Sequence, residues 1–231
     1  MLRRRLRWVA VLVVCCGSVA SAERPNILFI FTDDQAPWAL GLSGHPHART
    51  PVLDRLFRSG ARLTNCFTTT PVCSPSRAAL MTGRYGTELG ITDWLHPRRE
   101  GRHGLLPGTV TWPRLLESAG YRTSLIGKWH LGLLDRHHPT RFGYQHFYGF
   151  RSGGTRPNDA VLEVDGRNRK VPGLLPDVLV DEAIRFIGRE DDRPFLLSLH
   201  FRAPHAPWLP VADADWEPFR DLDPVLPHPD Y

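Results

Sequence analysis

Short apolar runs recur along the chain, separated by stretches in which apolar residues return every three or four positions. The runs predict β-strands, because continuous apolar segments of this length, rich in β-branched and aromatic residues, suit a covered sheet. The predicted strands are NILFIFT (26–32), ARLTNCF (61–67), YRTSLIG (121–127) and PFLLSLHF (194–201). For the first strand we expect neighbours on both faces.

Helical periodicity appears between these runs. TPVLDRLFRSG (50–60), TWPRLLESAG (111–120) and DVLVDEAIRFIGRE (177–190) predict helices. Thr111 is the expected N-cap of the second helix, and Gly60 and Gly120 close the first two. The face that the third helix should bury consists of Val178, Leu179, Ala183, Ile184 and Ile187. Another helix should begin near Ser74, with Pro75 in its first turn, where a missing N–H costs nothing.

The alternation of strands and helices predicts an α/β fold with a mainly parallel sheet and helices on both faces. Residues 136–176 are rich in Gly, Pro, His and Arg, and we expect them to form an extended surface excursion. The aromatic residues of GYQHFYGF (143–150) are expected in the core. Residues 221–231 contain no closing strand or helix, which suggests that the C-terminal part of the fold is missing.

The first 22 residues differ from the rest. A basic start, a short apolar run and the small residues before Ala22 predict a secretory signal peptide, with one incomplete domain over 23–231 and an exported protein. A membrane anchor and lipidation at Cys15 or Cys16 are the alternatives. No later stretch is long and apolar enough to span a membrane, so membrane contact is expected only through the leader.

The predicted leader also changes the charge balance. It contains four of the 29 Lys and Arg residues and none of the 24 Asp and Glu residues, so the rest of the chain is close to neutral. No basic stripe interleaved with aromatic residues remains, and a nucleic-acid partner is not expected.

Polar residues follow the predicted strands at the points where they end. Ligands of open α/β sheets bind at the carboxyl ends of the strands, so these residues should meet at one rim. They are Asp33 and Asp34 after the first strand, Cys73 in the loop after the second, Lys128 and His130 after the third, and His205 after the fourth.

Two of these positions raise the question of a metal. The adjacent carboxylates of Asp33 and Asp34 would repel each other without a cation, and oxygen ligands suit calcium or magnesium. The alternative is that the pair only caps a loop. Cys66 and Cys73 follow the leader, and a disulfide between them is the alternative to a chemical role for Cys73.

The other positions favour an anion. Cys73 would lie at the positive end of the helix dipole, and Arg77, one turn later on the same face, could reach the same anion. Lys128 and His130, two residues apart in an extended segment, would project to the same side and add a positive charge and an imidazole. The pattern predicts a site for a tetrahedral anion beside a metal.

The segment CSPSRAALMTGR, from Cys73 to Arg84, resembles the Cys-x-Pro-Ser-Arg motif of the type I sulfatases and the Thr-Gly-Arg segment that follows it. The resemblance extends to RPNILFIFTDDQ, TPVLDRLFRSGARLTNCFTTTPVC, LLESAGYRTSLIGKWHLG and PFLLSLHFRAPHAPWLP, and so to nearly all of the chain beyond the leader.

The resemblance implies an alkaline-phosphatase-like fold and hydrolysis of sulfate esters. It implies that a sulfatase-maturing enzyme, such as the formylglycine-generating enzyme, oxidises Cys73 to formylglycine, whose hydrate attacks sulfur. Asp33, Asp34 and the residue derived from Cys73 would bind calcium, with magnesium as the alternative ion. Arg77 would steady the formylglycine. Lys128, His130 and His205 would contact the sulfate or move protons, and the separate roles of the two histidines stay open.

One departure from the family is that no SDNG-like strand end or later lysine follows His205, so the calcium site and the smaller C-terminal subdomain would be incomplete. Two alternatives to an active sulfatase therefore stay open: a phosphonate or phosphate monoester hydrolase of the same superfamily, and an inactive remnant. The expected substrate is a sulfated small molecule or carbohydrate. Arg151, Arg156 and Arg167 could contact a polyanionic substrate, although a solvated surface is their ordinary role.

Overall fold

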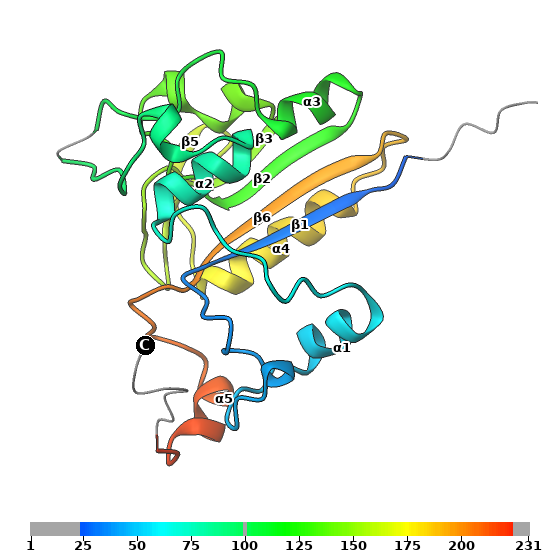
Figure 1. Cartoon of the computed structure of the whole chain (residues 1–231), viewed down its shortest axis with the longest axis vertical. Coiled ribbons are helices and arrows are strands. Elements are labelled where there is room, and N and C mark those ends of the chain that lie inside the picture. Colours follow the sequence, from blue (N-terminus) through cyan, green and yellow to red (C-terminus); the bar gives the residue numbers. More distant parts are fainter. Residues whose placement is uncertain (1–23, 99–100, 224–231) are drawn as a thin grey trace, which may run out of the picture.

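A six-stranded sheet lies at the centre of the fold (Figure 1). The computed structural model describes residues 24–98 and 101–223, so the predicted leader (1–22) lies outside the described residues. In spatial order the strands are β1 (Ile27–Asp33), β6 (Phe195–Pro204), β2 (Arg122–Lys128), β3 (His146–Phe150), β4 (Val161–Val164) and β5 (Arg167–Lys170). The first four strands in this order run parallel. β4 pairs antiparallel with both β3 and β5. The prediction of a mainly parallel sheet is confirmed.

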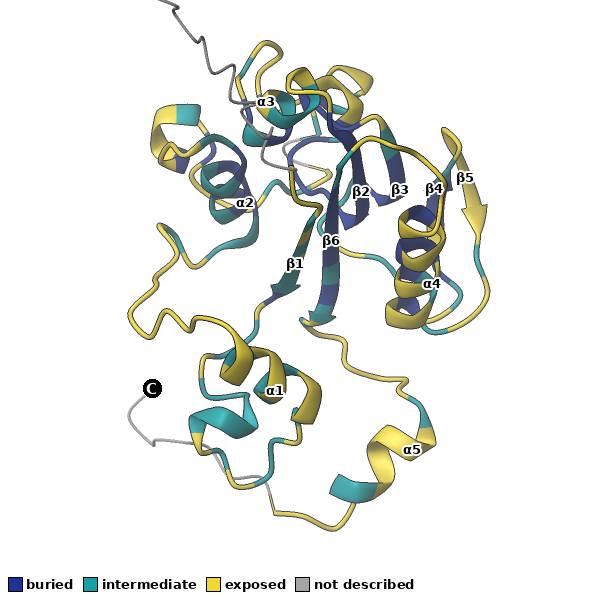
Figure 2. Cartoon of the chain, turned by 90° about the vertical axis from the view of Figure 1, so that its right-hand side faces the viewer, coloured by how far each residue is buried: buried dark blue, intermediate teal, exposed yellow. Residues whose placement is uncertain are grey.

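Helices cover both faces of this sheet, as predicted (Figure 2). The α-helices are α1 (Pro51–Ser59), α2 (Cys73–Thr82), α3 (Trp112–Ser118), α4 (Leu175–Ile187) and α5 (Asp213–Trp216). Short 3-10 helices span Gly41–Ser43, Gly86–Leu89, Asp135–His137, Pro139–Phe142 and Glu217–Phe219. No helix among the described residues has the length and apolar character that a membrane crossing requires.

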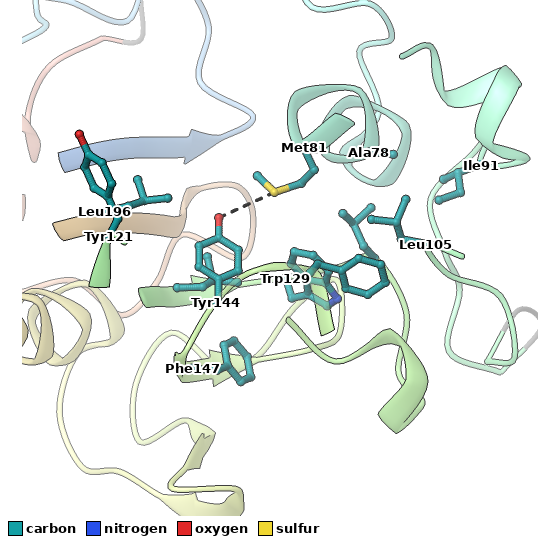
Figure 3. Close-up of a cluster of buried hydrophobic side chains, with 12 residues drawn as sticks. Ala78, Met81, Ile91, Leu105, Tyr121, Trp129, Tyr144, Phe147 and Leu196 are labelled. Atoms are coloured by element: carbon teal, nitrogen blue, oxygen red, sulfur yellow. Dashed lines mark hydrogen bonds between the residues drawn. The ribbon is translucent and has the colours of Figure 1, made fainter. Parts of the chain in front are cut away.

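Two apolar clusters hold these layers together. The first joins α2 and α3 to one face of the sheet and includes Met81, Trp129, Tyr144 and Leu196 (Figure 3). The second packs α4 against the other face through residues such as Leu179. Each large apolar side chain buried here contributes about 1.5–3 kcal/mol to folding. The clusters cover both sides of β2 and β6, whose carboxyl ends lead into candidate site residues.

Several sequence predictions are confirmed. The strands predicted at 26–32, 121–127 and 194–201 and the helices predicted at 50–60, 111–120 and 177–190 all exist within a few residues of their expected bounds. The Thr111 side chain accepts a hydrogen bond from the Arg114 backbone N–H, which makes it the predicted N-cap of α3.

The strand predicted at 61–67 is wrong. These residues form turns and irregular backbone, and the side chains of Leu63 and Phe67 are 77% and 85% exposed. No described strand pairs with residues 61–67, and all seven are exposed, so the apolar residues of this segment lie neither in the sheet nor in the core.

The surface excursion predicted at 136–176 is also wrong, because this segment contains β3, β4 and β5. Tyr144, Phe147, Tyr148 and Phe150 are buried, which confirms a core role for the aromatic residues of 143–150. The glycine, proline and arginine residues that suggested a loop lie mainly in the turns between these short strands.

Two predicted faces differ from those observed. Leu28 and Ile30 of β1 are 48% and 47% exposed, so this strand is covered on one face only. In α4 the buried residues include Leu179 and Ala183 as predicted, but Ile184 is 62% exposed. The side chain of Phe186 takes the core position instead, so the buried stripe is rotated from the predicted one.

Candidate anion-binding site

The candidate site lies where the carboxyl ends of β1, β2 and β6 meet the N-terminus of α2. The strands run parallel, so their ends share one edge of the sheet. At this edge Gly127 has a φ of 111°, and a Cβ placed on it would come within 1.9 Å of the His200 carbonyl oxygen. Only glycine permits β2 and β6 to approach so closely just before Lys128.

Asp33, the last residue of β1, is the carboxylate at the centre of the site. Its side chain is buried, and Oδ2 accepts a hydrogen bond from the Lys128 ammonium and lies 3.6 Å from Arg77 Nη2. Burial raises the pKa of Asp33, but the charges of Arg77 and Lys128 outweigh it and leave that pKa below its ordinary value. Asp33 therefore stays ionised between two buried cations.

Arg77 is 2% exposed and projects from α2 towards the sheet. Its Nη1 donates to the Lys128 backbone carbonyl at 2.9 Å, and its guanidinium lies 5.1 Å from the ring centroid of Phe31. The Nε and Nη2 atoms of Arg77 have no hydrogen-bond partner among the described residues. These two buried N–H-bearing atoms can donate to an anion that enters the site.

Cys73 is the first residue of α2, as expected for a residue at the positive end of the helix dipole. Its Sγ lies 3.6 Å from Asp33 Oδ1. Burial raises the pKa of the thiol, even though Lys128 acts in the opposite direction. Cys66 and Cys73 are both free, so the alternative of a disulfide is wrong.

His130 lies just beyond β2 with a φ of 56°, so it does not continue the extended backbone of Lys128. Its Nε2 lies 3.3 Å from the Leu95 carbonyl oxygen, to which only a protonated nitrogen can donate. Its buried Nδ1 then carries a lone pair and has no partner among the described residues. Burial, reinforced by the charge of Lys128, lowers the pKa of His130 to about 3, so the ring is neutral at physiological pH.

His205 lies at the rim of the site, in the turn that follows β6. Its Nδ1 is 2.7 Å from the Ala206 carbonyl oxygen, so Nδ1 carries the proton and Nε2 is free to accept one. A positive charge on His205 would help to lower the pKa of Asp33, after the larger effects of Arg77 and Lys128. Among the described residues no hydrogen bond or ion pair joins the His205 side chain to Asp33, Arg77 or Lys128, so its role in the site stays a prediction.

Sequence reasoning missed two buried residues at this edge, both on β6. His200 Nδ1 lies 3.3 Å from Arg77 Nη1, and its Nε2 has no partner among the described residues. Arg202 is 5% exposed, and the charge of Asp33 partly offsets the lowering of its pKa by burial. The sequence signal for these two residues is a polar side chain within or directly after an apolar strand run, here His200 in PFLLSLHF and Arg202 just beyond it.

The predicted metal ligands come together only in part. Asp33 and Cys73 are neighbours, whereas Asp34 is exposed with a φ of 61° and no contact joins it to them. Within 24–98 and 101–223, no three or more His, Cys, Asp or Glu side chains form a group that could hold a metal ion. Calcium takes six to eight oxygen ligands. The described residues alone do not fit a calcium ion.

The chain resembles proteins of known families in sequence. Residues 25–226 match the family model described as Sulfatase. The chain is 32% identical over 208 residues to an N-acetylglucosamine-6-O-sulfatase of Bacteroides thetaiotaomicron, covering 87% of this chain and 35% of that protein. It is 34% identical to the human N-acetylgalactosamine-6-sulfatase, covering 83% of this chain and 41% of that protein.

Solved structures show the same likeness in three dimensions. The crystal structure of Ps i-CgsB in complex with k-i-k-neocarrahexaose superimposes with a TM-score of 0.82 at 30% identity, over 87% of this chain and 50% of that one. BT4656 in complex with its substrate D-glucosamine-2-N,6-O-disulfate gives a TM-score of 0.75 at 32% identity, over 90% of this chain and 39% of that one. The chain thus spans less than half of the curated relatives' length.

Proposed function

The chain belongs to the sulfatase family, and we propose that it carries the nucleophile and anion-binding half of a sulfuric ester hydrolase. The observation that carries the proposal is the position of Cys73 at the N-terminus of α2, 3.6 Å from Asp33 and beside the buried cations Arg77 and Lys128. Positive charge around a potential nucleophile is what attack on a sulfate ester requires.

We further propose that Cys73 is converted to formylglycine by a sulfatase-maturing enzyme. The CSPSR motif at 73–77 supports this, and burial raises the pKa of the thiol, so an unmodified Cys73 would be a weak nucleophile. A formylglycine hydrate at this position would supply a hydroxyl as nucleophile and a second hydroxyl for release of the product.

Two cationic residues and a helix N-terminus would hold the sulfate group. Lys128 and Arg77 place positive charge beside Asp33, and Arg77 Nη2, which has no hydrogen-bond partner among the described residues, can donate to a sulfate oxygen. The N-terminus of α2, a helix of 10 residues, adds its backbone N–H groups and dipole. Because Arg77 also binds the Lys128 carbonyl, the cations are fixed before the anion arrives.

Two histidines would assist the movement of protons. His130 is neutral and carries a buried lone pair at Nδ1, which can accept a hydrogen bond from the group at position 73. Its pKa of about 3 makes it a weak base, so we propose that it orients this group rather than removing its proton. His205 sits at the rim, where Nε2 can exchange a proton with the leaving group of the ester. This assigns His130 to the nucleophile side and His205 to the substrate side.

Calcium stays a prediction of the family resemblance, with Asp33, Asp34 and position 73 as its expected ligands, and none of these steps depends on it. As substrate we propose a sulfated carbohydrate or small molecule. Two structural neighbours, Ps i-CgsB and BT4656, were crystallised with carbohydrate ligands, which favours the carbohydrate. Export through residues 1–22 is proposed on the sequence pattern alone.

The test is the mass of the tryptic peptide that contains Cys73, from protein produced in a host with a sulfatase-maturing system. Conversion replaces one sulfur and two hydrogen atoms by one oxygen atom, and this mass change is the expected result. A Cys73→Ala variant gives the control peptide. An intact thiol in that host would overturn the proposed modification.

Activity is tested in the same preparation. Release of sulfate from 4-nitrophenyl sulfate that disappears in Cys73→Ala would support the proposed hydrolase. Faster release of phosphate from 4-nitrophenyl phosphate would favour the phosphate monoester hydrolase instead, and a modified but inactive chain would favour the remnant.

A further inference from the structure

A cleft opens beside the proposed position of the sulfate group. It is an open cleft of about 570 Å³ between the segment 153–157, which follows β3, and the end of β6 with the turn after it. Arg156, Arg202 and His205 line the cleft, and no carboxylate is among its lining residues. Two guanidinium groups and an imidazole thus face one concave surface.

Arg202 is the unusual member of this group. It is 5% exposed, and its Nη1 donates to the Pro207 carbonyl oxygen at 3.0 Å. Arg77 and Arg151 are paired with carboxylates, but Arg202 forms no ion pair with any described residue. The charge of Asp33 acts on Arg202 only from beyond ion-pair distance, so an anionic ligand in the cleft would stabilise the buried guanidinium further.

The cleft is distinct from the position that the proposed sulfate occupies. Lys128 and Arg77 face Asp33 and do not line the cleft, whereas Arg202 and Arg156 line the cleft and do not contact Asp33 within ion-pair distance. His205 lines the cleft, and a positive charge on it would help to lower the pKa of Asp33, which places it between the two positions. One extended ligand could therefore place one anionic group at each position.

We propose that the cleft is a second anion subsite, in which Arg202 and Arg156 bind a further sulfate or carboxylate group of the substrate. The inference rests on the proposed function and narrows it: the substrate is a polyanionic carbohydrate rather than an aryl ester with one sulfate. The guanidinium of Arg202, held by its hydrogen bond to Pro207, would orient the bound anionic group. The exposed Arg156 would attract the anion electrostatically at the opening of the cleft.

Gly154 provides a sharp test of this subsite. A Cβ on Gly154 would meet only Arg202 Nε, at 4.0 Å, so an aspartate fits there and places a carboxylate beside the guanidinium. Gly154→Asp should neutralise Arg202 without removing it, and Gly154→Asn is the matched uncharged control. Arg202→Met is a further variant that keeps much of the side-chain packing.

The measurement uses the chain with Cys73→Ala, so that binding is separated from turnover. Inorganic sulfate is titrated at constant ionic strength, and the Nε–H signal of Arg202 is followed by NMR. We expect saturable binding at Arg202 that Gly154→Asn keeps and that Gly154→Asp weakens at least about tenfold, the effect of losing a charged hydrogen bond. No response of Arg202, or equal responses in the two Gly154 variants, would overturn the subsite.

The substrate class is tested with a matched pair of sugars, glucosamine 6-sulfate and glucosamine-2-N,6-O-disulfate, by calorimetry. The disulfate should bind at least about tenfold more tightly, and Arg202→Met or Gly154→Asp should abolish the difference while leaving the monosulfate unchanged. Equal affinity of the two sugars would overturn the assignment to substrate. Because neither assay needs turnover, an unmodified Cys73 would refute the proposed chemistry and leave the subsite standing.

Discussion

The charges of individual residues set the character of the site. Asp33 is held between Lys128 and Arg77, all three buried, and this arrangement keeps the cations in the fold before any ligand binds. Asp34, its sequence neighbour, is exposed and forms no ion pair with either cation in the described part of the chain. Asp33 and Asp34 therefore contribute differently to stability, and substitutions at the two positions can be compared directly.

Asp33→Asn should destabilise the fold strongly, because it leaves two buried cations without their carboxylate. The expected loss in the free energy of unfolding is about 3–5 kcal/mol, measured by urea denaturation. Asp34→Asn serves as the control and should change that free energy by less than about 0.5 kcal/mol. Similar losses for both variants would contradict the central position of Asp33.

His130 gives the fold a pH dependence of known sign. The folded ring stays neutral down to its pKa of about 3, whereas the unfolded chain takes up a proton near 6.5. Between these values the unfolded state binds more protons, so stability falls as the pH falls, by up to about 1.4 kcal/mol per pH unit.

His130→Gln should therefore have a shallower loss of stability than the unmodified sequence between pH 6.5 and pH 4.5. Urea midpoints measured across this range, and at pH 8 as the reference, give the two slopes. The two curves should converge as the pH falls. If they stay parallel, the ring is protonated in the folded state and its burial is not as described.

At the scale of elements, the segment after β3 shapes the site by lying against the residues that follow β2. The Gly153 backbone packs on the His130 ring so closely that a Cβ would come within 2.5 Å of Nε2. Gly154, the next residue, has room for one. The loop thus holds the imidazole in place through a contact that only glycine permits.

Gly153→Ala should displace the His130 ring and reduce the free energy of unfolding by about 1–3 kcal/mol, as overpacking of a filled site does. Gly154→Ala is the matched control and should be nearly neutral. The ring signals of His130 in NMR spectra report the displacement directly. Unchanged signals in the Gly153 variant would show that the loop moves instead of the ring.

The local pattern of apolar and capping residues was sufficient to predict some strands and helices but not others. The strands β1, β2 and β6 and the helix α3 were predictable because their apolar runs and caps are local in sequence. The short strands β3, β4 and β5 were hidden, because β4 and β5 have only four residues each and β5 is made entirely of polar residues. Pairing with neighbours, which no local pattern records, makes them strands.

The same distinction applies to the candidate site. Asp33, Cys73, Arg77 and Lys128 were predictable, because each stands in a recognisable motif or directly ends an apolar run. Arg202 was not predictable, because its role depends on a loop brought over it from residues 153–157. Its burial without a carboxylate partner is visible only in the assembled fold.

At the scale of the whole molecule, the edge of the sheet at β1 carries exposed apolar side chains. Among the described strands β1 pairs with β6 alone, and its Leu28 and Ile30 are nearly half exposed. An edge strand with exposed apolar side chains can pair with a second chain or with another segment. We therefore expect the 231-residue chain to self-associate through this edge.

The double variant Leu28→Thr/Ile30→Thr should reduce the mass of the species seen by size-exclusion chromatography with light scattering. Val161→Thr is the control, because this exposed valine lies on β4, which is paired on both sides. The control should leave the distribution unchanged. Equal effects of the two changes would point to general surface hydrophobicity rather than the open edge.

The sequence by itself determined the alternating architecture, the family, and the identity of Cys73, Arg77 and Asp33 as candidates, because periodicity and motif spacing are local properties. Tertiary structure alone decided which charges are paired. Asp33 meets Lys128 across 95 residues of chain, and Arg77 meets His200 across 123. Such contacts depend on how parallel strands align their ends, and only the assembled sheet brings those ends together.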